Sequence, residues 1–263
     1  MKSYSYVLLD PTGNLTCLVT DDVAPEDRAM VTEKLMDRCE QVGYLEAPTR
    51  PETVAKLRMM GNEFCGNAAM GTAAWLYHRE GLDGEKAMLL EVSGTEAPVR
   101  CVIRSVEDGW KGTVDMPPVT DIWREMAAGE LAAMVRMEGI LHMIMAADGM
   151  DTAKAESILK VMAERYPDPA VGLLLWDREK RIMTPLVYVR QSGTVVRETA
   201  CGSGTCAVGA WLALKRGDGV TVSEIRQPGG LIRAEAEVAQ GRILRVSISG
   251  KVRILDRGNI QIE

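Results

Sequence analysis

The chain contains an internal repeat, and this repeat restricts the possible folds more than any other feature. Residues 65–76 align with residues 201–212 at an offset of 136, and five of the twelve positions are identical. Both copies begin with Cys-Gly, continue with small residues and end with Trp-Leu. Self-similarity at about half the chain length indicates duplication of one structural unit. The repeat therefore predicts two similar halves, each with a helix that begins at a Cys-Gly pair.

Composition and charge exclude several classes of protein. Of the 263 residues, 46% are hydrophobic and 26% are charged, which is typical of a globular chain and excludes one that is mainly disordered. The formal net charge of −6 argues against a nucleic-acid partner. No apolar run reaches the roughly 18 residues that span a bilayer, and the first residues lack the apolar core of a signal peptide. We expect a cytoplasmic protein without a membrane partner.

Apolar runs and turn residues predict an α+β fold. An amphipathic helix is expected over 24–39 and another over 152–165, while Pro117-Pro118 interrupts the pattern and marks the boundary between the halves. Many short strands with few helices favour two α+β units over a repeated strand–helix–strand array. The expected strands are 4–9, 15–19, 42–45, 87–92, 99–103, 113–116, 141–145, 171–175, 186–189, 221–225, 232–238 and 243–248.

The six cysteines are too few for a disulfide scaffold in a chain of this length, so we expect free thiols. A metal site is not expected, because the chain has only two histidines and the spacing of Cys201 and Cys206 is not that of a zinc ligand pair. Four cysteines are expected to be structural: Cys17, Cys39, Cys101 and Cys206.

Cys65 and Cys201 are the candidate reactive residues. A helix N-terminus has unpaired N–H groups and a partial positive charge, which favour a thiolate and bind a carboxylate. Both thiols are therefore expected to be more acidic than a free cysteine. If both helix ends hold the carboxylate of one amino acid, one thiolate can remove the α-proton while the opposite thiol delivers a proton to the other face. This chemistry inverts the stereocentre and needs no cofactor.

Other residues give weaker signals. His78 is expected on a helix surface, and His142 is a minor candidate for lining the site. Gly202, Gly204 and Ala207 imitate a dinucleotide fingerprint, but the first copy of the repeat lacks these glycines and a fingerprint normally opens its own strand–helix–strand unit. A nucleotide cofactor is therefore not expected.

At these motifs the chain resembles the diaminopimelate epimerase superfamily of cofactor-independent amino-acid racemases. The segments Cys65-Gly-Asn67 and Glu198-Thr-Ala-Cys201-Gly-Ser-Gly-Thr205 are similar to the two catalytic motifs of that family, and the resemblance runs nearly end to end. It implies catalytic roles for Cys65 and Cys201. It also implies substrate contacts from Asn14, Glu40, Gln41, Gly66, Asn67, Glu198, Gly202 and Ser203.

The substrate implied by the resemblance is histidine. The diaminopimelate enzymes read the distal amino acid with further polar residues, and those positions are Arg58, Ile140 and Ala170 here. A site without those hydrogen-bonding groups discriminates against a charged distal end. The segments 11–14, 39–43, 61–67 and 201–205 are instead similar to the histidine racemases of opine-metallophore (staphylopine-type) pathways. Glu40 or Glu198 is then expected to bind the imidazole.

The family fold implied is two pseudo-symmetric halves, each a curled sheet around a central helix. The first half is expected to span 1–117 and to regain a final strand at 251–263, and the second half is expected to span 118–250. The resemblance also implies a homodimer. Four alternatives stay open: a diaminopimelate epimerase, a racemase of another amino acid, a phenazine-biosynthesis-type isomerase without paired cysteines, and a non-catalytic amino-acid binding module.

Overall fold

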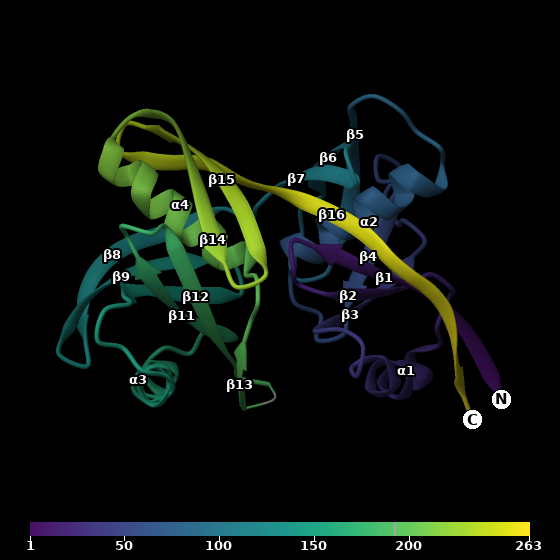
Figure 1. Ribbon diagram of the computed structural model, residues 1–263, viewed down its shortest axis with the longest axis horizontal. Coiled ribbons are helices and arrows are strands. Elements are labelled where there is room, and N and C mark those ends of the chain that lie inside the picture. Colours follow the sequence, from purple (N-terminus) through teal and green to yellow (C-terminus); the bar gives the residue numbers. More distant parts are fainter. Residues whose placement is uncertain (192) are drawn as a thin grey trace. The chain divides into compact units, whose positions relative to one another are not determined.

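The computed structural model describes residues 1–191 and 193–263, which form two compact units (Figure 1). The first unit consists of Met1–Asp115 and Ser249–Glu263, and the second consists of Met116–Ile248. Both units are mixed α+β and consist mostly of strands, which confirms the predicted class.

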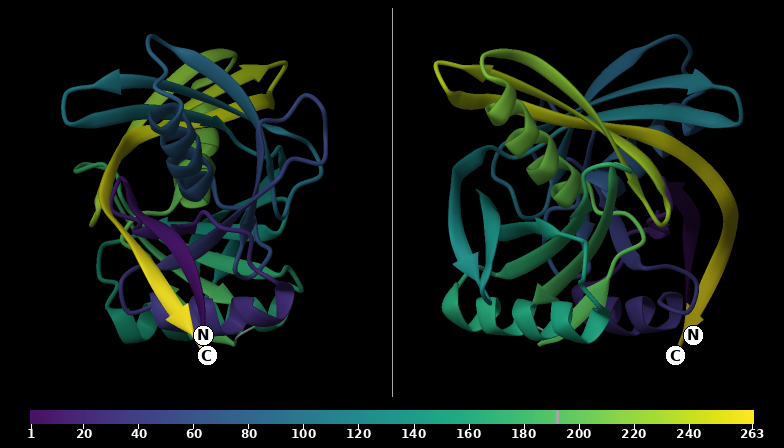
Figure 2. Two further views of the ribbon diagram at one scale, coloured as in Figure 1. Left: turned by 90° about the vertical axis from the view of Figure 1, so that its right-hand side faces the viewer. Right: turned by 60° about the vertical axis from the view of Figure 1, so that its left-hand side comes forward.

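The strands of the first unit form a sheet that closes on itself. Its strands neighbour one another in the order β1 to β7, and both β7 and β1 also neighbour β16. The β1–β16 pairing is antiparallel and runs from Lys2 opposite Ile262 to Pro11 opposite Val252 (Figure 2). The strands are β1 (Lys2–Pro11), β2 (Thr16–Val19), β3 (Gln41–Glu46), β4 (Ala55–Met59), β5 (Lys86–Val92), β6 (Val99–Val106), β7 (Gly109–Asp115) and β16 (Arg242–Ile262).

Helix α2 (Gly66–Arg79) is the central helix of this unit. It packs against β1, β2, β5, β6 and β7, and every residue from Gly66 to Tyr77 is buried. A helix enclosed on all sides must have apolar or small side chains around its whole circumference, which explains its Ala, Gly and Met residues. The shorter helix α1 (Arg28–Leu35) follows a single 3₁₀ turn, Pro25–Asp27.

The second unit has a sheet in the order β16, β15, β14, β12, β11, β10, β9 and β8, with β13 paired to β12. Helix α3 (Thr152–Arg165) and helix α4 (Gly202–Arg216) complete the unit. The strands are β8 (Val119–Ala127), β9 (Glu130–Met137), β10 (Ile140–Ala146), β11 (Ala170–Asp177), β12 (Ile182–Val189), β13 (Thr194–Arg197), β14 (Gly219–Gln227) and β15 (Gly230–Ala239).

The strands between the two helices of the second unit are buried on both faces. Leu141 and Met143 of β10 pack in the cluster that includes α3, whereas Ile144 packs in the cluster that includes Val208 of α4. Successive side chains of a strand point to opposite faces. This alternation places His142 on the same face as Ile144, towards α4.

Most of the predicted elements are present. The helix expected over 24–39 ends earlier, at Leu35, because the chain then turns so that the N–H groups of Glu40 and Gln41 both donate to the carbonyl of Leu15. The strands β4, β8, β9 and β13 were not anticipated. They are short or interrupted by charged residues, as in the Ala-Lys-Leu-Arg-Met sequence of β4, whose buried positions nevertheless alternate strictly.

None of the helices in the described residues is long and apolar enough to cross a membrane.

Close packing of α4 on β15 predicts the effect of one substitution. A Cβ added at Gly209 would overlap the Cβ of Ala234. Gly209→Ala is therefore expected to lower the free energy of unfolding by about 1–3 kcal/mol, as overpacked cores do, measured by urea denaturation. Arg216→Ala, at the exposed end of the same helix, is the control and should change it by less than about 0.5 kcal/mol. A stabilised Gly209→Ala variant would contradict this packing.

Candidate active site

The two repeated cysteines occupy the same structural position in their units: each is the N-cap of the central helix. Cys65 has φ −133° and ψ 108°, and Cys201 has φ −112° and ψ 111°. In each case the sulfur accepts the N–H of the residue three positions later, at 3.4 Å from Ala68 and 3.2 Å from Gly204. Serine, threonine, aspartate and asparagine are the preferred caps. Sulfur at both positions therefore points to a chemical role.

In the first unit, hydrogen bonds connect four of the predicted site residues in a chain. The amide nitrogen of Asn14 donates to Oε2 of Glu40 at 2.9 Å. Nε2 of Gln41 donates to Oδ1 of Asn14 at 2.6 Å, and the Cys65 thiol donates to Oε1 of Gln41 at 3.2 Å. The structure thus brings Asn14, Glu40, Gln41 and Cys65 together.

The orientation of the Gln41 amide is fixed by its neighbours. Nε2 donates to Asn14 and also to Oγ1 of Thr16 at 2.8 Å, so the oxygen end of the amide faces Cys65. An amide oxygen only accepts hydrogen bonds. Gln41 therefore binds the thiol form of Cys65. Gln41 was predicted to contact the substrate, and its contact with the cysteine sulfur was not predicted.

Four further predicted residues lie at the two helix starts. Gly66 and Asn67 are the first two residues of α2, and Gly202 and Ser203 are the first two of α4. Gly66, Asn67 and Gly202 are buried, and Ser203 is half-buried. The N–H groups of a helix's first turn have no partner inside the helix. These positions are suited to bind a substrate carboxylate.

In the second unit, Gln227 at the end of β14 fixes the backbone around Cys201. Its Oε1 accepts the N–H of Cys201 at 2.6 Å, and its Nε2 donates to Oγ1 of Thr205 at 2.8 Å. The Thr205 hydroxyl in turn donates to the carbonyl of Cys201 at 2.7 Å. Neither Gln227 nor Thr205 was predicted as a site residue, although Thr205 is the last residue of a motif that carried the family resemblance.

The expectation that Cys201 is more acidic than a free cysteine is wrong for this structure. Complete burial raises the pKa of the Cys201 thiol well above its usual value, and the nearby carboxylate of Glu198 raises the pKa further. Hydrogen bonds from Ser203 and from the N–H of Gly204 lower it, but by less. Desolvation therefore outweighs the helix N-terminus, and Cys201 is a thiol at neutral pH.

His142 of β10 extends the site of the second unit. Its Nε2 lies 2.9 Å from Oγ of Ser203, and that oxygen lies 3.4 Å from Sγ of Cys201. The imidazole is completely buried, which lowers its pKa to about 3, so the ring is neutral at physiological pH. His78, by contrast, lies exposed in the last turn of α2, as predicted. The interruption of an apolar strand by one histidine is the sequence signal for His142.

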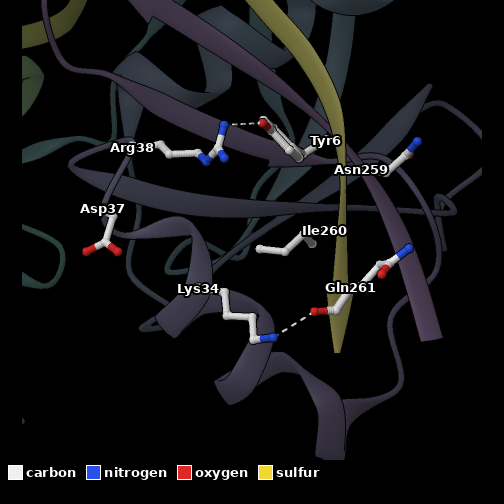
Figure 3. Close-up of a pocket in the computed structure, with 7 residues that line it drawn as sticks. All are labelled: Tyr6, Lys34, Asp37, Arg38, Asn259, Ile260 and Gln261. Atoms are coloured by element: carbon white, nitrogen blue, oxygen red, sulfur yellow. Dashed lines mark hydrogen bonds between the residues drawn. The ribbon is translucent and has the colours of Figure 1, made fainter. Parts of the chain in front are cut away.

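A hollow on the surface of the first unit lies elsewhere. It has a volume of about 420 Å³ and lies between α1 and the end of β16, lined by Lys34, Arg38 and their neighbours (Figure 3). None of the predicted site residues lines it. Its cations are already bonded, Lys34 to the carbonyl of Gln261 and Arg38 to the hydroxyl of Tyr6.

The remaining four cysteines are buried, in agreement with a structural role. Within the described part of the chain, no group of three or more His, Cys, Asp or Glu side chains is arranged to hold a metal ion.

Solved structures with the same fold are epimerases, racemases and related proteins. A predicted epimerase from Pseudomonas aeruginosa superposes with a TM-score of 0.73 over 99% of this chain and 100% of its own, at 17% identity. A probable proline racemase from Agrobacterium radiobacter superposes with a TM-score of 0.74 over 99% of this chain and 93% of its own, at 14% identity. The fold is therefore one that epimerases and racemases share.

Sequence comparison places the chain within this class. Residues 3–261 match the family described as the histidine racemase CntK N-terminal domain, and the chain belongs to this family. A histidine racemase from Staphylococcus aureus is 27% identical over 97% of this chain and 96% of its own length. One from Fusobacterium nucleatum is 27% identical over 98% and 96%. The chain is accordingly an amino-acid racemase, an isomerase.

The buried imidazole predicts how stability depends on pH. The pKa of His142 is about 3 in the folded chain, against an ordinary value near 6.5 when it is unfolded. Between these values only the unfolded chain binds the proton, so stability falls as the pH falls from about 6.5 and is unaffected above it. Acidification from pH 7 to pH 5 should therefore lower the free energy of unfolding by about 2 kcal/mol through this histidine.

The measurement is urea denaturation of the wild type and of His142→Gln at pH 7 and pH 5. The decrease in the free energy of unfolding from pH 7 to pH 5 should be about 2 kcal/mol smaller in His142→Gln than in the wild type, since glutamine does not titrate. His78→Gln, at the exposed histidine, is the matched control and should keep the wild-type slope. Equal slopes for all three proteins would contradict a neutral buried His142.

Proposed function

We propose that this racemase interconverts L- and D-histidine without a cofactor, with Cys65 and Cys201 as its acid and base. The observation that carries the proposal is the matching position of the two cysteines. Each caps the N-terminus of a buried helix with nearly the same backbone angles and the same sulfur–amide contact. Membership of a histidine racemase family supports the choice of substrate. The matching caps also support two halves derived from one duplicated unit.

The reaction requires one sulfur on each face of the α-carbon. A thiolate removes the α-proton from one face and becomes a thiol, and the opposite thiol gives its proton to the other face and becomes a thiolate. The negative charge that develops on the substrate is stabilised by the helix N–H groups beside Gly66, Asn67, Gly202 and Ser203. For the reverse reaction the two cysteines exchange roles.

The surroundings of the two sulfurs favour an initial assignment of roles. Cys201 is buried beside Glu198 and is held as a thiol, which suits it to deliver a proton. Cys65 is only half-buried. We therefore assign Cys65, once it has lost the proton that it donates to Gln41, as the base and Cys201 as the acid for one of the two enantiomers.

Glu40 is the carboxylate best suited to bind the imidazole. Asn14 donates to one of its oxygens, and Asn14 is joined through Gln41 to Cys65. A carboxylate held in place accepts a hydrogen bond from an imidazole N–H or from the α-ammonium group. Glu198, which lies close to Cys201, can accept a hydrogen bond from whichever of these two substrate groups Glu40 does not bind. We further propose a cytoplasmic homodimer whose D-histidine product enters metallophore biosynthesis.

The first test is α-proton exchange in deuterated buffer without added cofactor, over a panel that includes L-histidine, L-proline and diaminopimelate. Exchange together with racemisation of histidine is expected. Exchange confined to another amino acid would retain the mechanism and replace the substrate. Binding without exchange would favour the binding-module alternative.

The cysteines are tested by Cys65→Ser and Cys201→Ser. Each is expected to lower kcat for racemisation by about 10²–10⁴-fold, because each replaces a thiol by a hydroxyl, which is a far weaker acid. Cys206→Ala is the matched control, because Cys206 lies in α4, the helix that Cys201 caps. Its thiol is completely buried, and burial raises its pKa to about 12. The control should retain activity. Full activity of both serine variants would instead favour an isomerase that does not use the cysteine pair.

Imidazole recognition is tested by Glu40→Gln. Loss of a charged hydrogen-bond acceptor is expected to lower kcat/KM for histidine by about 10- to 100-fold. Glu33→Gln, on the exposed face of α1, is the control and should leave kcat/KM unchanged. If Glu40→Gln retains wild-type activity on histidine, Glu40 has no part in recognising the imidazole.

A further inference from the structure

His142 lies in a space that a neighbouring glycine leaves open. Gly172 of β11 is paired directly with His142 of β10. A Cβ at Gly172 would overlap Nδ1 of the imidazole and lie 2.7 Å from its Cε1. The glycine is thus required for the Nδ1–Cε1 edge of the ring to lie against β11 while Nε2 is directed at Ser203.

The surroundings of the ring determine which nitrogen carries its proton. Nε2 has Ser203 as its partner, whereas Nδ1 is buried and has no hydrogen-bond partner. A buried N–H without an acceptor is less well tolerated than a buried acceptor without a donor. A neutral ring in this place therefore favours the proton on Nε2 and a lone pair on Nδ1.

The contact with Gly172 supports the same assignment. The hydrogen that Gly172 carries in place of a Cβ points towards Nδ1. A lone pair on Nδ1 makes a weak attractive contact with that Cα–H group. A proton on Nδ1 would instead clash with the Cα hydrogen of Gly172.

The proton on Nε2 orients the Ser203 hydroxyl. Nε2–H donates to Oγ of Ser203, which leaves the hydroxyl proton free to point to the sulfur of Cys201, 3.4 Å away. A hydroxyl that donates to sulfur stabilises the thiolate more than the thiol.

We propose that His142 is a positioning residue, which holds the Ser203 hydroxyl as a hydrogen-bond donor to Cys201 and so supports the thiolate form of that cysteine. The inference rests on the proposed function for its significance, because only a two-cysteine racemase needs Cys201 as a base as well as an acid. At Cys201 the hydroxyl acts against complete burial and against the carboxylate of Glu198, and it acts together with the N–H of Gly204. At His142 burial alone shifts the pKa, and no charged group contributes.

The contrast with the first unit explains why such a device is needed. Gln41 presents only an acceptor to Cys65, since its amide nitrogen is held by Asn14 and Thr16. A half-buried sulfur can also be solvated as a thiolate by water. Cys201 is 3% exposed and depends on the protein for that stabilisation.

The tautomer is tested by NMR of protein labelled with ¹⁵N-histidine, without substrate. The chain has only two histidines, and the His78→Gln variant assigns the two sets of signals. The expected result is a neutral His142 with its proton on Nε2 from pH 5 to 8. A proton on Nδ1 would overturn the proposal, because Nε2 would then accept the hydroxyl proton of Ser203.

The effect on Cys201 is tested by following its alkylation by iodoacetamide against pH, resolved by peptide mass spectrometry. His142→Leu should lower the thiolate fraction at a given pH by about two- to tenfold, while His142→Gln, which keeps a donor, should restore much of it. Ser203→Ala should lower it at least as much as His142→Leu. Adding His142→Leu to Ser203→Ala should then have no further effect. An unchanged pH profile in folded His142→Leu, or additive effects, would overturn the proposal.

These measurements use no substrate, so their outcome is separate from that of the proposed function. Should His142→Leu not fold, the tautomer of His142 in the wild type still tests the proposal, because a proton on Nδ1 would overturn it. If the tautomer and the thiolate shift are as expected but no α-proton exchange occurs, the proposed function fails while the role of His142 towards Cys201 stands.

Discussion

The contact between a cysteine sulfur and the third N–H of a buried helix is the interaction on which both units depend. It ends the strand-like approach of the chain, begins the central helix and leaves a sulfur at the point where the helix has unpaired N–H groups. The helices are enclosed by strands, so their first residues cannot move without disturbing the core. Rigid placement of this kind is what a proton-transfer group requires.

The two sulfurs have similar backbone geometry but different surroundings, and this difference matters for a racemase. L- and D-amino acids have equal free energies, so the reaction has an equilibrium constant of one. In the two-cysteine mechanism proposed above, each sulfur therefore acts in both protonation states. The amide oxygen of Gln41 favours the thiol at Cys65, and burial beside Glu198 favours the thiol at Cys201. Helix N–H groups and the Ser203 hydroxyl act in the opposite direction.

Much of the fold, and the matching positions of the two repeated cysteines, could be predicted from the sequence. The repeat indicated Cys65 and Cys201, and local periodicity indicated helix 152–165 and most strands. Acidity was misjudged at Cys201 because burial and the approach of Glu198 depend on tertiary packing, which outweighs the local helix N-terminus. The contact of Gln227 with Cys201 was missed because a hydrogen bond between residues 26 positions apart has no local sequence signal. Short strands with charged residues, such as β4, were missed because the charged side chains interrupt the apolar run.

The strand β16 has a consequence for how the chain folds. Its last part closes the ring of the first unit against β1, yet it follows the whole second unit in the chain. Residues such as Lys2 and Ile262 must therefore meet across nearly the full sequence before the first unit is complete. Contacts of such high sequence separation slow folding and leave strand edges exposed meanwhile. Until β16 is in place the ring of the first unit cannot close, and β1 and β7 both have an unpaired edge that can pair with the wrong strand.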